Sequence, residues 1–153
     1  MNRIVIDPSV ALKWYFHEAF SEQALKLATH GNEIVVPDIL FSQVGAVLWR
    51  RVKAGEMRRE DAHKVLTNLR RLPLHTVSPS ELAPAALEIA TGTARTFNES
   101  IYFALAMRER TELVTADRWW YSLLSTGPMK RYLKWIGDYG RPPQEGQTVQ
   151  PLR

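Results

Sequence analysis

The sequence has no cysteine among its 153 residues, which excludes disulfide bridges and thiolate metal sites. This is compatible with a reducing compartment, and we expect a cytoplasmic protein. No apolar run approaches the length of a membrane span, and the first residues lack the pattern of a signal peptide. The 4 histidines show no metal-ligand spacing. What is present is a chain of ordinary single-domain size, with 45% hydrophobic residues to form a core.

Positive charge exceeds negative charge only slightly. Lys and Arg number 20 against 16 acids, which gives a net charge of +4. Such an excess mildly favours a polyanionic partner such as nucleic acid. Basic residues are concentrated in the middle of the chain, but a solvated helix face is the commoner explanation of such a run. Charge alone therefore does not identify a partner.

Short apolar segments alternate with helical patterns along the chain. We expect strands near residues 3–6, 34–36, 74–77, 113–117 and 131–136. Helical patterns cover residues 9–16, 21–30, 39–54, 58–71, 80–90, 96–110 and 119–124. This alternation predicts an α/β fold, a three-layer α/β/α sandwich around a mostly parallel sheet. We expect one domain over residues 1–137 and a C-terminal tail over 138–153, where apolar residues become scarce.

Two of the expected strands run into an acid, Asp7 and Asp117. The carboxyl edge of an open α/β sheet is where ligands bind, so these acids are candidates for chemistry. Glu99, in the first turn of the preceding helix, could join them. Crowded carboxylates repel one another unless a cation offsets the repulsion, and Mg²⁺ or Mn²⁺ prefers oxygen ligands. Helix capping or a first-turn charge explains each acid about equally well.

Two hydroxyl residues and one amide stand near these acids in the sequence. Ser9 is a plausible N-cap of the first helix, and Thr115 lies at the end of a strand. Either hydroxyl could orient an acid or a metal-bound water. Gln43 lies on a helix face with Ile39 and Val47, which we expect to look toward Asp7. We assign Ser9, Gln43 and Thr115 to substrate contact or to support of the acids.

Four segments together resemble a known family. They are VIDPSVALKW (residues 5–14), VPDILFSQV (36–44), NESIYFALA (98–106) and LVTADR (113–118). In order and spacing they are similar to the motifs of PIN-domain nucleases, especially VapC-type toxins of toxin–antitoxin pairs. The resemblance implies a PIN fold and Mg²⁺- or Mn²⁺-dependent cleavage of single-stranded RNA. It also implies a homodimer, inhibition by a cognate antitoxin, and a catalytic metal site at Asp7, Glu99 and Asp117.

Three positions depart from the pattern of this family, one of them Gly45, which replaces a family Asn. Gln43 stands where the family normally has Glu, and Glu99 stands where it has Asp. Glu99 keeps the charge but extends its oxygens by about 1.5 Å, and Mg²⁺ tolerates such displacement poorly. Gln43 is neutral and cannot act as a general base. These departures predict weaker metal binding and weakened nuclease activity.

Two classes of function remain open from the sequence. The first is a metal-dependent endoribonuclease, the toxin of a toxin–antitoxin pair. The alternative is a catalytically degenerate PIN domain that binds RNA or a protein without cutting. A phosphatase on a similar sheet is a third and weaker option, because a fold does not fix a function.

Overall fold

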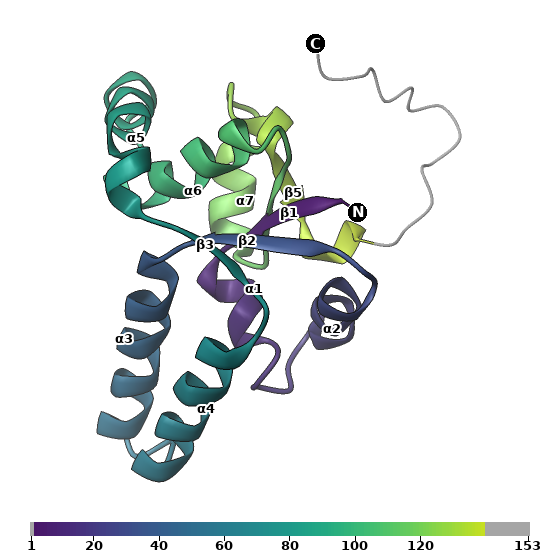
Figure 1. The fold of residues 1–153 in the computed structure, drawn as a ribbon, viewed down its shortest axis with the longest axis vertical. Coiled ribbons are helices and arrows are strands. Elements are labelled where there is room, and N and C mark those ends of the chain that lie inside the picture. The colour runs from purple at the N-terminus through teal and green to yellow at the C-terminus, as the bar shows by residue number, and fades with distance from the viewer. Residues whose placement is uncertain (1, 140–153) are drawn as a thin grey trace.

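The computed structural model describes residues 2–139 and has a five-stranded sheet at its centre. The strand order is β3-β2-β1-β4-β5, and all neighbouring strands are parallel. The strands are Arg3–Ile6 (β1), Glu33–Pro37 (β2), His75–Val77 (β3), Leu113–Thr115 (β4) and Leu133–Trp135 (β5). The predicted α/β fold with a parallel central sheet is confirmed (Figure 1).

Helices cover both faces of this sheet (Figure 1). They are Pro8–Leu12 (α1), Ser21–Thr29 (α2), Ile39–Lys53 (α3), Arg59–Arg71 (α4), Pro79–Thr93 (α5), Phe97–Arg108 (α6) and Arg118–Leu124 (α7). Short 3-10 turns, Lys130–Tyr132 (η1) and Ile136–Asp138 (η2), flank β5. In Figure 1, α5 and α6 lie above the sheet, and α1 to α4 lie below it. The α3–α4 pair forms a hairpin that extends away from the sheet (Figure 1).

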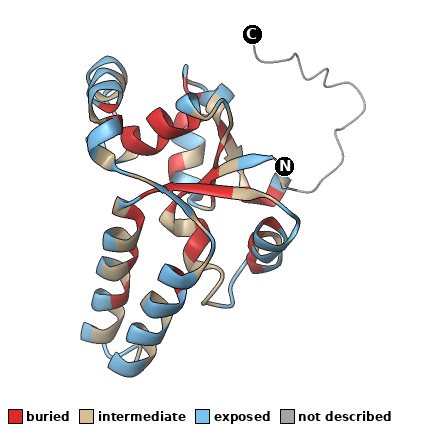
Figure 2. Cartoon of the chain, viewed as in Figure 1, coloured by how far each residue is buried: buried red, intermediate tan, exposed pale blue. Residues whose placement is uncertain are grey.

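The core lies between the strands and the helices packed on them. Val5, Ile6 and Val36 are 0% exposed, as expected for parallel strands that are covered on both faces. In α6, all residues from Ser100 to Ala106 are buried, so this helix is enclosed on every side (Figure 2). By contrast, the outer surfaces of α3 and α4 are largely exposed (Figure 2).

Two helix starts differ from the expectation. Helix α1 begins at Pro8 with Asp7 as its N-cap, so the prediction that Ser9 caps this helix is wrong. Helix α5 begins at Pro79, with Ser78 as its cap. Proline suits the first helical position because its φ is preset and no N–H is needed there. In both cases the residue before proline takes the extended conformation that a cap requires.

The C-terminal part of the described chain continues past β5. The Asn32 side-chain amide donates to the Tyr139 hydroxyl at 2.5 Å, which links the end of the described chain to the start of β2. Of the predicted tail, residues 140–153 lie outside the described residues. Within residues 2–139, no helix combines the length and the apolar character that crossing a membrane would need.

Candidate active site at the carboxyl edge of the sheet

Asp7 follows β1 directly and is buried, with 6% of its surface exposed. Its backbone is extended, and its Oδ1 accepts a hydrogen bond from the backbone N–H of Val10 at 3.2 Å. The interpretation of Asp7 as a helix cap is therefore correct, but capping does not explain its burial. A cap needs only one carboxylate oxygen at a helix end, and such caps are usually solvated. Complete burial of an acid at the edge of a sheet requires further partners.

Two hydroxyl groups supply those partners. Ser9 Oγ donates to Asp7 Oδ1 at 2.5 Å, and Thr115 Oγ1 donates to Asp7 Oδ2 at 2.5 Å. The hydroxyls are themselves held from the backbone after β4, because Ser9 Oγ accepts from Ala116 N at 2.9 Å and Thr115 Oγ1 accepts from Asp117 N at 3.1 Å. Each carboxylate oxygen of Asp7 thus accepts a hydrogen bond from a hydroxyl that in turn accepts one from a backbone N–H.

The protonation of Asp7 reflects a balance between burial and these donors. Burial raises the pKa of Asp7 from 3.8 to about 6, because a desolvated carboxylate is costly. The hydrogen bonds from Ser9, Thr115 and Val10 lower the pKa, and the negative charge of Asp117 raises it further. Burial prevails, so Asp7 is an acid that titrates close to neutral pH. Such perturbed acids are typical of functional sites.

Asp117 lies two residues beyond β4, so the prediction that the strand itself extends to this acid is wrong. Strand β4 ends at Thr115, and Asp117 caps α7 by accepting from Trp120 N at 2.9 Å. The parallel register of Ile6 with Val114 places the segment after β4 beside the segment after β1. Asp117 and Asp7 are therefore close enough for the charge of one to affect the pKa of the other.

Glu99 approaches the same place from α6. Its backbone N–H donates to Thr96 Oγ1 at 3.2 Å, and Thr96 is the N-cap of that helix. The side chain lies in the first turn of α6, where the helix dipole stabilises negative charge. Glu99 is half-buried, and no side-chain hydrogen bond to it is found within residues 2–139. Its carboxylate is accordingly available to a ligand.

Gln43 reaches the site from α3 and has a partner that the sequence reasoning did not single out. Tyr102 is 2% exposed, and its hydroxyl donates to Gln43 Oε1 at 2.6 Å. Burial raises the pKa of Tyr102, and the charge of Asp7 raises it further, so the phenol stays a donor. The available signal was spacing, because Tyr102 stands three positions after Glu99 and shares its helix face. The amide nitrogen of Gln43 has no partner within residues 2–139.

These side chains line one pocket with a volume of about 350 Å³. The three predicted acids, Ser9 and Gln43 all line this pocket. Thr115 is fully buried behind it, where it contacts Asp7 and the backbone N–H of Asp117. The full lining is Asp7, Pro8, Ser9, Gln43, Thr96, Asn98, Glu99, Tyr102, Asp117, Trp119 and Trp120. The pocket thus combines acids, amides and aromatic rings.

The donor atoms suit a hard divalent cation, although the acids are not drawn together as a ligand cluster. Asp7, Glu99 and Asp117 offer only oxygen, the ligand type that Mg²⁺ and Mn²⁺ prefer. Within residues 2–139, no group of three or more His, Asp or Glu side chains is spaced to hold a metal ion. The fit to such an ion thus rests on the type of donor atom and on the proximity of Asp7 and Asp117, whose charges affect one another.

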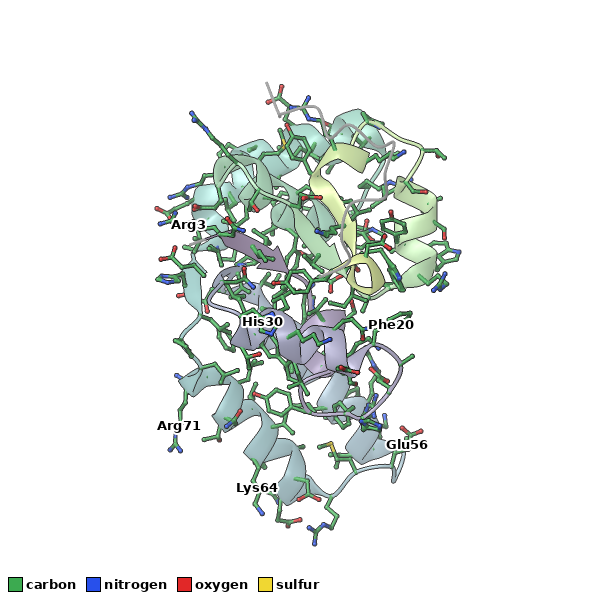
Figure 3. The ribbon with its side chains drawn as sticks, turned by 90° about the vertical axis from the view of Figure 1, so that its right-hand side faces the viewer. Arg3, Phe20, His30, Glu56, Lys64 and Arg71 are labelled. Atoms are coloured by element: carbon green, nitrogen blue, oxygen red, sulfur yellow. The ribbon has the colours of Figure 1, made fainter. Side chains whose placement is uncertain are left out.

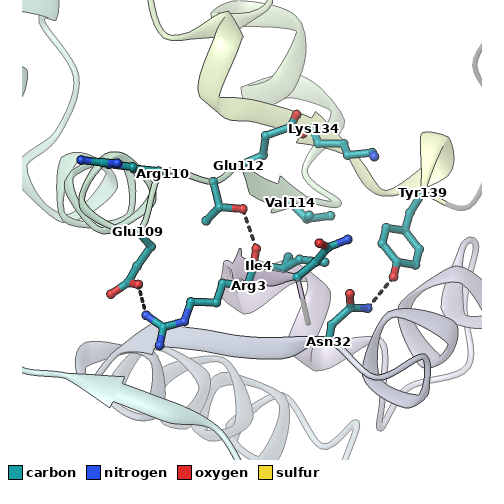
Figure 4. A pocket seen from close by; sticks show the side chains of 11 residues that line it. Arg3, Ile4, Asn32, Glu109, Arg110, Glu112, Val114, Lys134 and Tyr139 are labelled. Atoms are coloured by element: carbon teal, nitrogen blue, oxygen red, sulfur yellow. Dashed lines mark hydrogen bonds and ion pairs between the residues drawn. The ribbon is translucent and has the colours of Figure 1, made fainter. Parts of the chain in front are cut away.

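A second hollow of about 460 Å³ lies at the opposite end of β1 and β4 (Figure 4). Its walls carry charges of both signs, including Arg3, Glu109, Glu112 and Lys134. Arg3 pairs with Glu109 at 2.5 Å. Burial raises the pKa of Glu112, and the nearby charge of Lys134 opposes this shift. Although this hollow is larger, basic side chains stand among its acids, whereas, among the described residues, the lining of the pocket at the carboxyl edge carries acids and no Lys or Arg, so that pocket is the better candidate.

The basic residues of the middle of the chain lie on the α3–α4 hairpin. Lys64 and Arg71 extend outward from α4 (Figure 3) and line a shallow hollow there. Others have partners within the hairpin region, since Arg51 lies 3.9 Å over the Phe16 ring and Arg58 pairs with Asp61. This surface is mostly a solvated helix face, and it is separate from the acidic pocket.

Comparison with known proteins decides the family. A family model described as PIN domain matches residues 4–123, most of the chain. The chain belongs to the PIN domain family. The match covers β1 through the greater part of α7 and so includes all the acids of the pocket.

Individual PIN proteins show similarity at lower identity. The chain is 28% identical to Ribonuclease VapC3 of Pyrobaculum aerophilum over 120 residues, which are 76% of this chain and 90% of that protein. The crystal structure of PAE2754 from the same organism has a TM-score of 0.66 and 18% identity, covering 89% of this chain and 85% of that one.

Two further similar structures are described as complexes. VapBC2 from Rickettsia felis, bound to a DNA fragment from its promoter, has a TM-score of 0.61 and 14% identity. That match covers 87% of this chain and 98% of the other. A toxin–antitoxin complex from Klebsiella pneumoniae has a TM-score of 0.58 and 16% identity, with 87% and 97% covered. At such identities these likenesses show the PIN fold.

Proposed function

We propose that this PIN protein is a metal-dependent endoribonuclease that cleaves single-stranded RNA, the toxin of a toxin–antitoxin pair. The observation that carries the proposal is the pocket at the carboxyl edge of β1 and β4, lined by Asp7, Glu99 and Asp117. Support comes from membership of the PIN family and from the similarity to a protein named as a VapC ribonuclease.

In this proposal Asp7, Glu99 and Asp117 hold one Mg²⁺ or Mn²⁺ ion. Such an ion supplies a Lewis acid that lowers the pKa of water and neutralises charge on the phosphate. Ser9 and Thr115 act through Asp7 by fixing both of its oxygens at 2.5 Å. Their donated hydrogen bonds also favour the charged form of Asp7, the form that binds a cation. Ser9 and Thr115 are thus positioning residues.

In this proposal Gln43 lowers the affinity of the site for a cation, but the three carboxylates that hold the cation remain. The amide is neutral, so the pocket has one carboxylate fewer than a site with Glu at that position. Its Oε1 is engaged by the Tyr102 hydroxyl at 2.6 Å and has less capacity for a cation. The amide nitrogen can donate to a substrate oxygen, which is the substrate contact assigned to Gln43.

The proposal includes partners. Similar folds occur in structures described as VapBC and toxin–antitoxin complexes, which supports a cognate antitoxin for this chain. A homodimer and a cytoplasmic location complete the proposal on the same family grounds.

The test is cleavage of single-stranded RNA with Mg²⁺ or Mn²⁺, comparing wild type with Asp7→Asn. Asn keeps the size and one acceptor of Asp7 but removes the charge, so we expect activity to fall by about 100-fold or more, the loss of several kcal/mol of electrostatic stabilisation. EDTA should abolish the wild-type activity. Equal cleavage by the two proteins would overturn the proposal and attribute the activity to a contaminant.

A second candidate is a degenerate PIN domain that binds RNA or a protein without cutting it. Two observations favour it, the engagement of Gln43 Oε1 by Tyr102 and the lack, within residues 2–139, of a cluster of three potential ligands. A calorimetric titration with Mn²⁺ separates the two candidates. Saturable binding at sub-millimolar concentration that is lost in Asp7→Asn supports the nuclease, and no binding supports the degenerate domain.

A further inference from the structure

Trp119 stands at the mouth of the acidic pocket with its ring open to solvent. It lies in the first turn of α7, two residues after Asp117, and lines the pocket together with that acid. Its exposed fraction is 74%, the highest among the large hydrophobic side chains that are exposed. Tryptophan is normally well buried because of its large apolar surface. An exposed tryptophan ring beside a candidate active site is therefore available to contact a molecule bound there.

The other tryptophans of the described chain have partners. Trp120 packs on Phe103, and Trp135 lies near Phe20. Trp49, which is 62% exposed, lies beneath the Lys53 ammonium at 4.9 Å. Within residues 2–139, no ring or cation lies on the Trp119 ring. Its face is free for an external group.

The pocket beneath Trp119 also contains unused hydrogen-bond donors. The amide nitrogens of Gln43 and Asn98 lack partners in the described chain. Gln43 is half-buried and Asn98 is exposed, so both amides can donate to a ligand that brings acceptors into the pocket. A ring face and several donors together suit a flat group with carbonyl or ring-nitrogen acceptors on its edge.

We propose that Trp119 is the platform on which one nucleobase of single-stranded RNA stacks, with the base edge turned toward the amides of Gln43 and Asn98. This inference rests on the proposed ribonuclease function and names how that site holds its substrate. An apolar peptide side chain could cover the Trp119 ring but would leave these donors unpaired. A nucleobase satisfies both features, and aromatic stacking is a common way for proteins to hold unpaired bases.

Electrostatics points the same way. Asp7, Glu99 and Asp117 line the pocket and repel phosphate in the absence of a cation. An uncharged base is the part of RNA that this pocket can hold under those conditions. Stacking is also largely insensitive to salt, unlike the contacts of phosphates with basic side chains. The Trp119 contribution to RNA binding should therefore persist at high ionic strength.

The experiment measures binding of a fluorescein-labelled short oligouridylate in EDTA by fluorescence anisotropy. Trp119→Ala should weaken binding by about 10-fold, and Trp119→Phe by less, because a smaller ring still stacks. Trp49→Ala is the matched control, since it removes another exposed tryptophan from a different surface, and it should bind like wild type. Circular dichroism and thermal melting of each variant confirm that it is folded.

A second ligand tests whether the base is what Trp119 contacts. The same ribose–phosphate chain without bases should bind wild type and Trp119→Ala equally weakly. The proposal is overturned if Trp119→Ala binds oligouridylate like wild type, or if it weakens both ligands equally. Equal losses in Trp119→Ala and Trp49→Ala overturn it as well.

The outcome is independent of the proposed cleavage. All binding is measured in EDTA, where no cutting is expected, and Asp7→Asn should retain the Trp119-dependent part of binding. If wild type binds oligouridylate through Trp119 but never cleaves RNA with Mg²⁺ or Mn²⁺, the ribonuclease proposal fails and the stacking proposal stands. If wild type cleaves RNA but Trp119→Ala binds it equally well, the stacking proposal fails alone.

Discussion

The hydroxyl of Thr115 donates to Oδ2 of Asp7 at 2.5 Å, which joins the ends of β4 and β1. The two residues directly follow Val114 and Ile6, which are paired in the parallel register of these strands. Ser9 holds the other carboxylate oxygen, so hydroxyl donors fix both oxygens of Asp7. The consequence is an acid that is buried and oriented, with a pKa raised to about 6.

The first prediction concerns stability against pH in EDTA. Because the pKa of Asp7 is about 6 in the folded state and 3.8 for the same side chain in water, the folded state binds the proton more tightly between these values. The free energy of unfolding should therefore fall as pH rises from about 4 to about 7, by roughly 3 kcal/mol from this group. Urea denaturation of wild type and Asp7→Asn measures the difference. A pH profile of wild type that parallels the profile of Asp7→Asn would contradict the prediction.

The second prediction removes one hydroxyl donor. Thr115→Val keeps the shape of the buried side chain but deletes the hydrogen bond that lowers the pKa of Asp7. We expect the pKa of Asp7 to rise above 6, and the free energy of unfolding at neutral pH to fall by about 1–3 kcal/mol. Carboxyl carbon chemical shifts followed against pH report the pKa. Thr111→Val is the matched control, since it changes the same residue type at the other end of the sheet and should leave the pKa of Asp7 unchanged.

The third prediction separates the two roles of Asp117. Its side chain caps α7, and in the proposed function it also holds the metal. Asp117→Asn keeps a good N-cap, so it should lose RNA cleavage while the melting temperature stays near that of wild type. Asp117→Ala should lose cleavage and also about 1 kcal/mol of stability. If Asp117→Asn cleaves RNA as well as wild type, Asp117 only caps α7 and does not hold the metal.

The fourth prediction concerns Gln43. Gln43→Glu adds a carboxylate that can still accept from the Tyr102 hydroxyl. Without metal, the added repulsion should lower stability by roughly 1–2 kcal/mol. Mn²⁺ should then raise the melting temperature of Gln43→Glu more than that of wild type, by mass action on the folded state, and cleavage should increase. Melting curves that match wild type with and without Mn²⁺ would show that position 43 does not face the acids.

Much of the fold followed from local patterns. The apolar segments around Val5, Val35 and Val114 predicted parallel strands, because only strands covered on both faces are apolar throughout. Helix ends were less well predicted, as at Asp7 and Ser9. A cap depends on which of two neighbouring polar residues adopts the extended backbone, and here Pro8 decided it.

The sequence by itself determined an α/β sheet and the acids that follow two of its strands. These follow from residue type and period, which are local properties. Only the tertiary structure decided that Thr115 and Ser9 hold opposite oxygens of Asp7, that Tyr102 engages Gln43, and that Trp119 stays open beside the pocket. Those facts depend on the β1–β4 register and on the approach of α3 to α6. Contacts between residues far apart in the chain arise from such packing, and no local pattern encodes them.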